Sequence, residues 1–370
     1  MKILIASSAF YPENSPRSYR ATELAKEFVK QGHQVTLITL PVDNRTAEYC
    51  LQFGIQLKSL GSRRLKPIPI HGSGVKILIG RIVNRLLLQL IEYPDIELMG
   101  KYHKALRQEG GYDLLVSLAV PYPVHWGVAR ARKKNHPIAS VWVADCGDPY
   151  TGNRSDSFRK LFYFQWVERW MFRKTDFISI PIDSARAAYF PEFQNKIVVI
   201  PQGVNFEDLM IGLPNYFPNA VPTFAYAGSF MPGTRDPRNF IEYLNGLQQD
   251  FRFYIYTTMG SFIQDLVAKS SGRIITSPYL TRKELISTLA TMDFLVNFEN
   301  ITTTQAPSKL IDYYLTRRPI LSVGTQEVNK KNLHEFLAGN YQARHQTEGY
   351  EKFRIENVTN SFLTLAQKHE

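Results

Sequence analysis

The chain has 370 residues, of which 44% are hydrophobic and 21% are charged. These proportions are those of a folded globular protein, and the length exceeds what one hydrophobic core usually supports, so we expect two domains. Cys50 and Cys146 are the two cysteines of the sequence, which excludes a disulfide-stabilised scaffold and favours a reducing compartment, the cytoplasm.

The formal net charge of +11 belongs to the first half of the chain. Residues 1–203 contain 28 Lys and Arg against 17 Asp and Glu, whereas residues 204–370 contain 16 of each. A basic half predicts an anionic partner, either nucleic acid or an acidic membrane surface. The first apolar run is too short for a signal peptide, and no run approaches the roughly 18 apolar residues of a transmembrane helix, so we expect neither.

The first half alternates strands with helices. A strand at 2–7 is followed by a loop at 8–18, a helix at about 18–31 and a strand at 34–40, and further strands are expected at 113–118, 138–144, 177–180 and 197–200. These strands are nearly all apolar, as strands covered on both faces are. The alternation predicts a parallel, doubly wound sheet.

The pattern restarts after a linker at 212–222, which holds three Pro, one Gly and two Asn. Strands are expected at 223–227, 251–257, 273–276, 293–297 and 319–323, with helices at 237–249, 260–270, 281–291 and 308–316. We therefore predict an α/β protein with two doubly wound, Rossmann-like domains, 1–203 and 204–346, facing a central cleft. The tail at 347–370 is expected to form a helix that packs back on the first domain.

The most informative segment is APSKLID, residues 306–312, at the start of an expected helix. Backbone N–H groups at a helix start favour a phosphate, and Ser308 and Lys309 add a hydroxyl and an ammonium group. We predict that these two residues and Pro307 bind a diphosphate. Asp312 lies on the same side of the helix as Lys309, where it can accept hydrogen bonds from a ribose. An ordinary helix start is the alternative interpretation.

A second candidate for phosphate binding follows the strand at 223–227. Gly228 lets the backbone approach a phosphate closely, and Ser229 follows it. Arg235 can clamp a phosphate with two hydrogen bonds and neutralise a leaving diphosphate. The alternative is a plain strand–loop–helix turn with a solvated arginine.

The first half offers candidates for binding a second substrate. Asp145 and Asp148 follow a buried strand, where carboxylates suit hydroxyl recognition or proton transfer, although an aspartate before a proline also starts turns. Arg17 and Arg20, between the first strand and the first helix, predict an acidic or phosphorylated substrate. His125 is a weaker candidate, because a lone histidine early in a helix is more often packed than functional.

Several cofactor classes lack their sequence signature here. The first strand–helix loop has no G-x-G-x-x-G spacing, which argues against a nicotinamide or flavin enzyme. No spacing of His, Cys and Asp resembles a metal site, and there is neither a Walker loop nor a G-x-S-x-G segment. We therefore expect no metal and no bound cofactor.

Residues 58–107 combine ten Lys and Arg with three acidic residues and long apolar runs. Arg81 and Arg85 share one helix face, and apolar residues fill much of the rest. Such a helix can lie in a membrane interface with its bases toward lipid headgroups, so we expect peripheral attachment to the inner membrane face. A helix packed on the domain with a solvated face is the alternative. Nucleic acid is less favoured, because the stretch lacks interleaved stacking aromatics.

Four segments together resemble glycosyltransferase family 4. FYPENSPRSYRATELAKEFVKQGHQVTLIT resembles the opening of the family, VIPQGVNFEDL its hinge segment, YAGSFMPGTRDPRNFIEYL its donor loop, and PSKLIDYYLTRRPIL its donor-binding helix. The resemblance spans nearly the whole chain. It implies the GT-B fold, a nucleotide-diphospho-sugar bound by the second domain, an acceptor bound by the first, retention of the anomeric configuration and no metal.

The resemblance also implies residue roles. Lys309 and Arg235 correspond to the diphosphate-binding bases of the family and Asp312 to the acid that holds the ribose. Asp145 lies near the first-domain position, often a histidine in the family, that lies over the transferred sugar.

Two predicted donor-site residues depart from the family pattern. Thr304 stands where the family has an acid, and Ser229 stands where it has an arginine. Both departures bear on the identity of the donor sugar more than on the type of reaction.

The sequence thus predicts a retaining hexosyltransferase. It would move a sugar from a nucleotide-diphospho-sugar to a hydroxyl of a lipid-linked saccharide, in surface polysaccharide or glycolipid synthesis. Two alternatives remain open: a GT-B-fold sugar-nucleotide epimerase, and a non-catalytic partner subunit that binds glycan or membrane.

Overall fold

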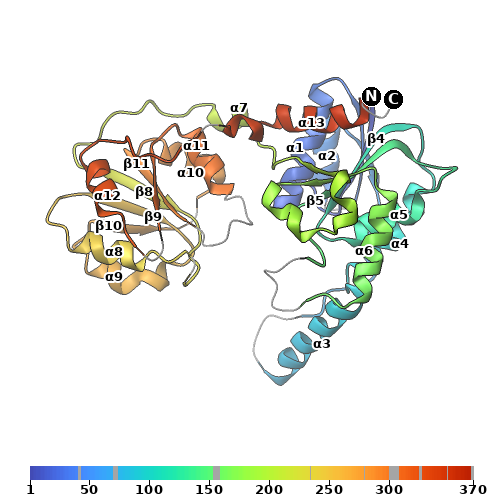
Figure 1. Cartoon of the computed structure of the whole chain (residues 1–370), viewed down its shortest axis with the longest axis horizontal. Coiled ribbons are helices and arrows are strands. Elements are labelled where there is room, and N and C mark those ends of the chain that lie inside the picture. The colour runs from blue at the N-terminus through green and yellow to red at the C-terminus, as the bar shows by residue number, and fades with distance from the viewer. Residues whose placement is uncertain are drawn as a thin grey trace. The chain divides into compact units, whose positions relative to one another are not determined.

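The computed structural model describes residues 1–40, 43–69, 74–152, 159–233, 235–278, 280–299, 308–324, 327–347 and 349–367. The chain divides into two compact units. The first unit comprises Met1–Val204 and Lys352–Glu370, and the second comprises Asn205–Glu351. Each unit contains one parallel sheet, of seven strands in the first and five in the second, with helices packed around it (Figure 1). The predicted α/β class with two doubly wound sheets is therefore confirmed.

The sheet of the first unit has the order β3-β2-β1-β4-β5-β6-β7. Its strands are β1 (Lys2–Ala6), β2 (Gln34–Thr39), β3 (Gln56–Ser59), β4 (Tyr112–Ala119), β5 (Ala139–Cys146), β6 (Phe177–Ile180) and β7 (Ile197–Val199). The order reverses between β1 and β4, which pair with Ala6 opposite Ser117. Ligands of doubly wound sheets bind outside the carboxyl ends of the strands at such a reversal.

Helices cover both faces of this sheet. The helices of this unit are α1 (Pro16–Lys30), α2 (Asn44–Gln52), α3 (Val75–Ile91), α4 (Ile96–Leu106), α5 (Pro123–Ala131), α6 (Tyr163–Lys174) and α13 (Ile355–Gln367), with short 3₁₀ helices η1 (Asp183–Ala188) and η2 (Pro191–Lys196). Helix α1 begins where Ser15 caps it, its side chain accepting a hydrogen bond from the Ser18 N–H at 3.2 Å. The last helix, α13, buries Ile355, Val358 and Phe362 in the core of the first unit beside α1.

The sheet of the second unit has the order β10-β9-β8-β11-β12. Its strands are β8 (Thr223–Ala227), β9 (Arg252–Tyr256), β10 (Ile274–Ser277), β11 (Phe294–Phe298) and β12 (Ile320–Val323). Its helices are α7 (Phe206–Met210), α8 (Arg238–Asn245), α9 (Gln264–Ala268), α10 (Arg282–Leu289), α11 (Ser308–Leu315) and α12 (Lys330–Leu337), with 3₁₀ helix η3 (Gly260–Ile263); η4 (Tyr350–Phe353) spans the boundary between the units. Here the strand order reverses between β8 and β11.

The predicted linker runs along the surface of the second unit and is fixed at its end. The carboxylate of Asp293, just before β11, accepts hydrogen bonds from Tyr216 Oη at 2.7 Å, from the Asn219 N–H at 3.1 Å and from the Thr223 N–H at 2.7 Å. One buried acid therefore ties the linker to the starts of β8 and β11.

Several predicted elements differ from the structure. Strand β3 was not expected, because its sequence QLKS is half exposed at the sheet edge and has no apolar run. The helix predicted at 260–270 is a 3₁₀ turn followed by a five-residue helix, and the helix predicted at 237–249 ends before Gly246. The terminal helix begins at Ile355 rather than at the predicted 347.

Candidate functional site

The carboxyl end of β8 and the start of α11 form one candidate site in the second unit. Gly228 follows β8 with φ of +145°, a conformation that glycine adopts readily, and its N–H donates to the Tyr256 carbonyl at 3.0 Å. The Ala227 N–H donates to Tyr313 Oη on α11 at 2.8 Å. This bond holds α11 against the end of β8, so the two predicted phosphate-binding segments are brought together.

Lys309, in the first turn of α11, has a buried ammonium group. Its Nζ has no hydrogen-bond partner among the residues that the structure describes, and it lies 4.6 Å from the centre of the Tyr226 ring. Burial, and to a smaller extent the nearby positive charge of Arg235, lowers the pKa of Lys309 to about 7. Buried polar groups almost always have partners, so an ammonium group in this state is chemically suited to an anion.

Arg235 is held over the loop that follows Gly228. Its Nη1 donates to the Ser229 carbonyl at 3.3 Å, and its backbone exchanges two hydrogen bonds with Met231, at 3.1 and 2.7 Å. Tyr226 Oη donates to the same Ser229 carbonyl at 2.9 Å. The turn at Ser229 is therefore fixed from two sides, with Arg235 close enough to Lys309 to affect its pKa.

The carboxylate of Asp312, on α11, forms an ion pair with Arg282 of α10. Arg282 Nε and Nη2 both donate to Asp312 Oδ1, at 2.9 and 2.5 Å. Burial raises the pKa of the Asp312 carboxyl, and the Arg282 guanidinium opposes that rise. The sequence analysis did not identify Arg282, because it lies 30 residues before Asp312 and no local pattern indicates that the two pair.

Two of the predicted donor residues, Thr304 and Pro307, lie outside the described residues. Ser308 is the first residue of α11. The structure thus brings together Gly228, Ser229, Arg235 and Lys309.

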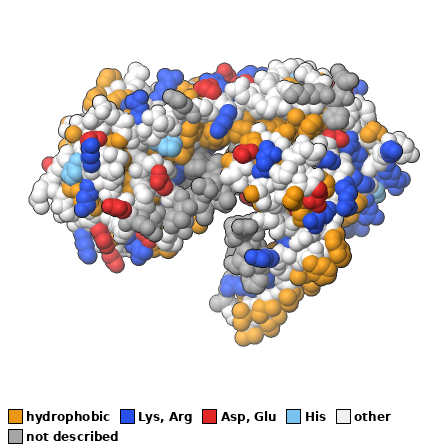
Figure 2. Space-filling view, viewed as in Figure 1, with side chains coloured by type: hydrophobic (Ala, Val, Ile, Leu, Met, Phe, Trp, Pro, Cys, Tyr) orange, Lys and Arg blue, Asp and Glu red, His pale blue; other side chains and the backbone are white. Residues whose placement is uncertain are grey.

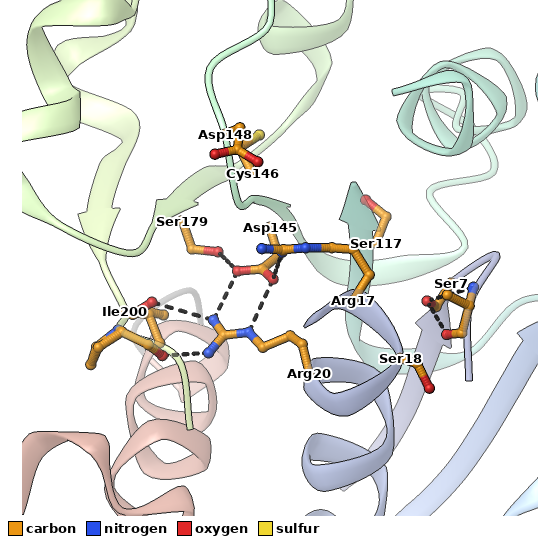
Figure 3. Close-up of polar contacts among 12 residues, drawn as sticks. Ser7, Arg17, Ser18, Arg20, Ser117, Asp145, Cys146, Asp148, Ser179 and Ile200 are labelled. Carbon is orange, nitrogen blue, oxygen red and sulfur yellow. Dashed lines mark hydrogen bonds and ion pairs between the residues drawn. The ribbon is translucent and has the colours of Figure 1, made fainter. Parts of the chain in front are cut away.

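In the first unit, Asp145 forms a buried ion pair with Arg20 at the carboxyl end of β5 (Figure 3). Arg20 Nε lies 3.1 Å from Asp145 Oδ2, and Arg20 Nη2 lies 2.9 Å from Oδ1. Ser179 Oγ donates to Oδ1 at 2.6 Å. Burial raises the pKa of Asp145, but the Arg20 guanidinium overcomes that effect and holds the pKa below its usual value. The carboxylate is therefore ionised and only 3% exposed.

Arg20 also contacts the segment that follows β7. It donates to the backbone carbonyls of Ile200 and Pro201, just after β7 (Figure 3). Only 2% of Arg20 is exposed, so this predicted acceptor-binding residue is engaged within the protein and has little surface to offer a substrate.

Arg17 is the more accessible base of this group. Its Nη1 lies 3.7 Å from Asp145 Oδ2, and 19% of its side chain is exposed. A methyl group placed on Gly147 would lie 1.9 Å from Arg17 Nη2, so the guanidinium rests directly against that glycine. Asp148 is exposed on the same loop, with its backbone carbonyl accepting from Tyr122 Oη at 2.8 Å. Arg17 and Asp148 therefore remain able to contact a ligand at this strand end.

His125 lies in the core of the first unit and is fully buried. Its Nδ1 lies 2.7 Å from Ser117 Oγ, which also accepts from Trp142 Nε1 at 2.8 Å, and its Nε2 lies 3.7 Å from Cys146 Sγ. Burial lowers the pKa of His125 to about 3, so the ring is neutral at physiological pH. This environment is that of a packed histidine, and it does not favour the predicted contact with an acceptor.

Side chains of the types that ligate metals do not cluster in the part of the chain that the structure describes. No group of three or more His, Cys, Asp or Glu residues there is arranged to hold a metal ion.

Comparisons with known proteins agree on one family and one fold. The profile of Glycosyltransferase Family 4 matches residues 18–208. The structure of a glycosyltransferase from Rickettsia africae ESF-5 aligns with a TM-score of 0.61 at 13% identity, over 100% of this chain and 98% of that one. A comparison with curated protein sequences found no match.

Two further structures have more specific descriptions. The apo form of the lipopolysaccharide outer core galactosyltransferase WaaB aligns with a TM-score of 0.59 at 11% identity, over 100% of this chain and 99% of that one. Anabaena HepE in complex with UDP aligns with a TM-score of 0.59 at 10% identity, over 100% of both chains. These similarities confirm the predicted GT-B fold.

Proposed function

The chain belongs to glycosyltransferase family 4, and we propose that it transfers a sugar from a nucleotide-diphospho-sugar to a hydroxyl group, with retention of the anomeric configuration. The observation that carries this proposal is the buried Lys309 ammonium group without a hydrogen-bond partner among the described residues. It lies beside the Gly228 turn and Arg235, where it suits a diphosphate. The UDP bound by Anabaena HepE, which has the same fold, supports this choice of ligand class.

We assign the charge-stabilising role to Lys309, Arg235 and the first backbone N–H groups of α11. When the bond between the anomeric carbon and the diphosphate breaks, negative charge develops on the leaving oxygen. A new bond forms from the acceptor oxygen to the anomeric carbon on the same face, and the acceptor proton passes to the leaving diphosphate. Two cations at this position supply the charge that a metal would otherwise supply, so we expect turnover to withstand a chelator such as EDTA.

Asp312 is proposed to hold the ribose, and Arg282 to orient it. Both Arg282 hydrogen bonds go to Oδ1, so Oδ2 is the oxygen that we assign to the ribose hydroxyls. Ser229, Thr304, Pro307 and Ser308 complete the proposed donor site.

Asp145 was predicted to be catalytic, but its burial favours a positioning role. The carboxylate is held by Arg20 and Ser179, and it in turn lies 3.7 Å from Arg17 Nη1. We propose that Asp145 fixes Arg17, and that Arg17 and Asp148 contact the acceptor.

For the acceptor we propose a lipid-linked saccharide at the cytoplasmic face of a membrane, in surface polysaccharide or glycolipid synthesis. The galactosyltransferase WaaB, whose fold this chain shares, acts on the lipopolysaccharide outer core, and the basic first unit suits an anionic surface. A sugar-nucleotide epimerase would instead change the free donor without any acceptor.

A thermal-shift screen of UDP-, GDP- and ADP-sugars tests the donor class. A ligand at about 100 times its dissociation constant stabilises a folded protein by about 2.7 kcal/mol, so one nucleotide family should raise the melting temperature clearly. Binding by none of them would contradict the proposal and favour the non-catalytic subunit. Conversion of a bound sugar nucleotide to its epimer without an acceptor would favour the epimerase.

A further inference from the structure

Helix α3 exposes an apolar stripe along its whole length. None of its 17 residues is buried. Eight large apolar side chains on this helix are between 40% and 73% exposed: Val75, Leu78, Ile79, Ile82, Val83, Leu86, Leu90 and Ile91. The first seven are spaced three and four residues apart, which puts them along one side of the helix, and Ile91 is the last residue of the helix. The opposite side packs on the chain, since a methyl group at Gly80 would lie 3.0 Å from the Pro69 carbonyl.

Two exposed aromatic side chains extend this stripe. Phe162 is 68% exposed and Trp166, on α6, is 65% exposed, and their rings pack edge to face with centroids 5.5 Å apart. Hydrogen bonds tie this segment to the last turn of α3, from Tyr163 Oη to the Leu90 carbonyl and from Gln89 Nε2 to the Arg159 carbonyl. We call the eight α3 side chains together with Phe162 and Trp166 the apolar ridge; hydrophobic side chains dominate the surface over α3 (Figure 2).

The charges around the apolar ridge are basic. Val75–Ile91 contains Lys76, Arg81 and Arg85 and no acidic residue. The next acid along the chain, Glu92, is buried and paired with Lys160. Exposed aliphatic side chains, a tryptophan and clustered bases together are typical of elements that lie in the interface of an anionic bilayer.

The ridge suits insertion parallel to the bilayer surface rather than across it. Among the described residues, no helix is long and apolar enough to cross a membrane. Helix α3 projects from the rest of the first unit (Figure 1), so its stripe can enter a flat surface without rearrangement of the fold.

We propose that the apolar ridge inserts into the headgroup region of a membrane leaflet that contains anionic lipid, with the exposed α3 bases Lys76 and Arg81 near lipid phosphates. The proposal specifies the surface by which the first unit would meet a membrane. It does not depend on sugar transfer: a protein that binds vesicles but no nucleotide would support this inference and contradict the proposed function.

Flotation of the full chain with vesicles tests the inference. We expect binding to phosphatidylcholine vesicles containing phosphatidylglycerol, weak binding to phosphatidylcholine alone, and loss of binding as salt screens the charges. The variant Ile82→Glu/Leu86→Glu should bind about tenfold or more weakly, because it puts charge where apolar area would be buried. Leu51→Glu is the matched control, since Leu51 is an 85% exposed side chain on α2, outside the ridge.

Quenching of tryptophan fluorescence by brominated acyl chains gives a second readout. Of the four tryptophans, Trp126 and Trp142 are buried and Trp170 is half-buried against the core of the first unit. We therefore expect most of the lipid-dependent quenching to disappear in Trp166→Phe. Absence of binding to anionic vesicles at low salt would overturn the proposal, as would equal binding by Ile82→Glu/Leu86→Glu. A dimer that dissociates in that variant, without vesicle binding by the original chain, would assign the ridge to a second copy instead.

Discussion

Arg20 and Asp145 form a two-point ion pair in the interior of the first unit, with Nε 3.1 Å from Oδ2 and Nη2 2.9 Å from Oδ1. The remaining hydrogen bonds of Arg20 go to the carbonyls of Ile200 and Pro201. This one side chain therefore connects α1, the end of β5 and the segment after β7, which are far apart in the sequence.

Removing either partner of this pair should destabilise the protein strongly. We expect Arg20→Ala or Asp145→Ala to lower the free energy of unfolding by about 3–5 kcal/mol, because each leaves an uncompensated buried charge. Urea denaturation measures the loss. The control Arg17→Ala, which removes a base at 3.7 Å from Asp145 Oδ2 that is partly exposed, should cost much less. Equal small losses in all three variants would contradict the assigned role.

The Arg20–Asp145 ion pair should also make the free energy of unfolding depend on pH in the acid range. The folded pKa of Asp145 is held below its usual value, so its contribution is complete above the ordinary aspartate pKa of about 3.9 and is lost as the pH falls through the lower folded value. We expect the free energy of unfolding to fall less steeply between about pH 5 and pH 3 in Asp145→Asn than in the original chain. Parallel curves would contradict this expectation.

Arg282→Ala should weaken the binding of nucleotide sugars. Burial raises the pKa of Asp312, and without Arg282 that rise is unopposed, so a larger fraction of the carboxyl is protonated and less of it is the charged acceptor that the ribose needs. We expect about a tenfold loss of affinity by calorimetry, larger at acid pH. Lys283→Ala, an exposed base on the same helix, is the control. Identical affinities in the two variants would show that Arg282 does not orient the acid.

Binding of a diphosphate should take up a proton at Lys309. Its pKa is lowered to about 7, so above that pH the unliganded Lys309 side chain is mostly a neutral amine. A bound diphosphate favours the charged ammonium form and raises the pKa. Titration with UDP-glucose at about pH 8, in two buffers of different ionisation enthalpy, should reveal the uptake. UDP-glucose suits this test because its phosphates do not titrate near this pH. Lys309→Gln should abolish the uptake, and unchanged uptake in that variant would place the proton elsewhere.

Much of the fold followed from simple patterns in the sequence. Strand β1, KILIA, has four buried residues in succession, and apolar runs of this kind are recognisable without a structure. Helix α1 was also predicted, although it begins at Pro16, behind its cap Ser15, rather than at the predicted residue 18. Strand β3 has no such apolar run in its sequence, because an edge strand that is half exposed does not need one.

The candidate site could be predicted only in part. Lys309 and Gly228 were identified because a helix start and a strand-end glycine have local signatures. Their neighbours were not, since Arg282 meets Asp312 across 30 residues and Arg20 meets Asp145 across 125. Pairings of that separation depend on tertiary structure, which also determines that His125 is buried and that Trp166 is exposed.

The central claim is that Lys309 binds the diphosphate of the donor. Calorimetric titration of the full chain with UDP, GDP and ADP tests it most directly, comparing Lys309→Ala with the original protein and with Lys331→Ala, an 84% exposed lysine on α12. Charge-assisted hydrogen bonds contribute about 1.5–3 kcal/mol, so the account predicts about a tenfold to hundredfold loss of affinity in Lys309→Ala and none in Lys331→Ala. Equal affinity in Lys309→Ala and the original protein would contradict it.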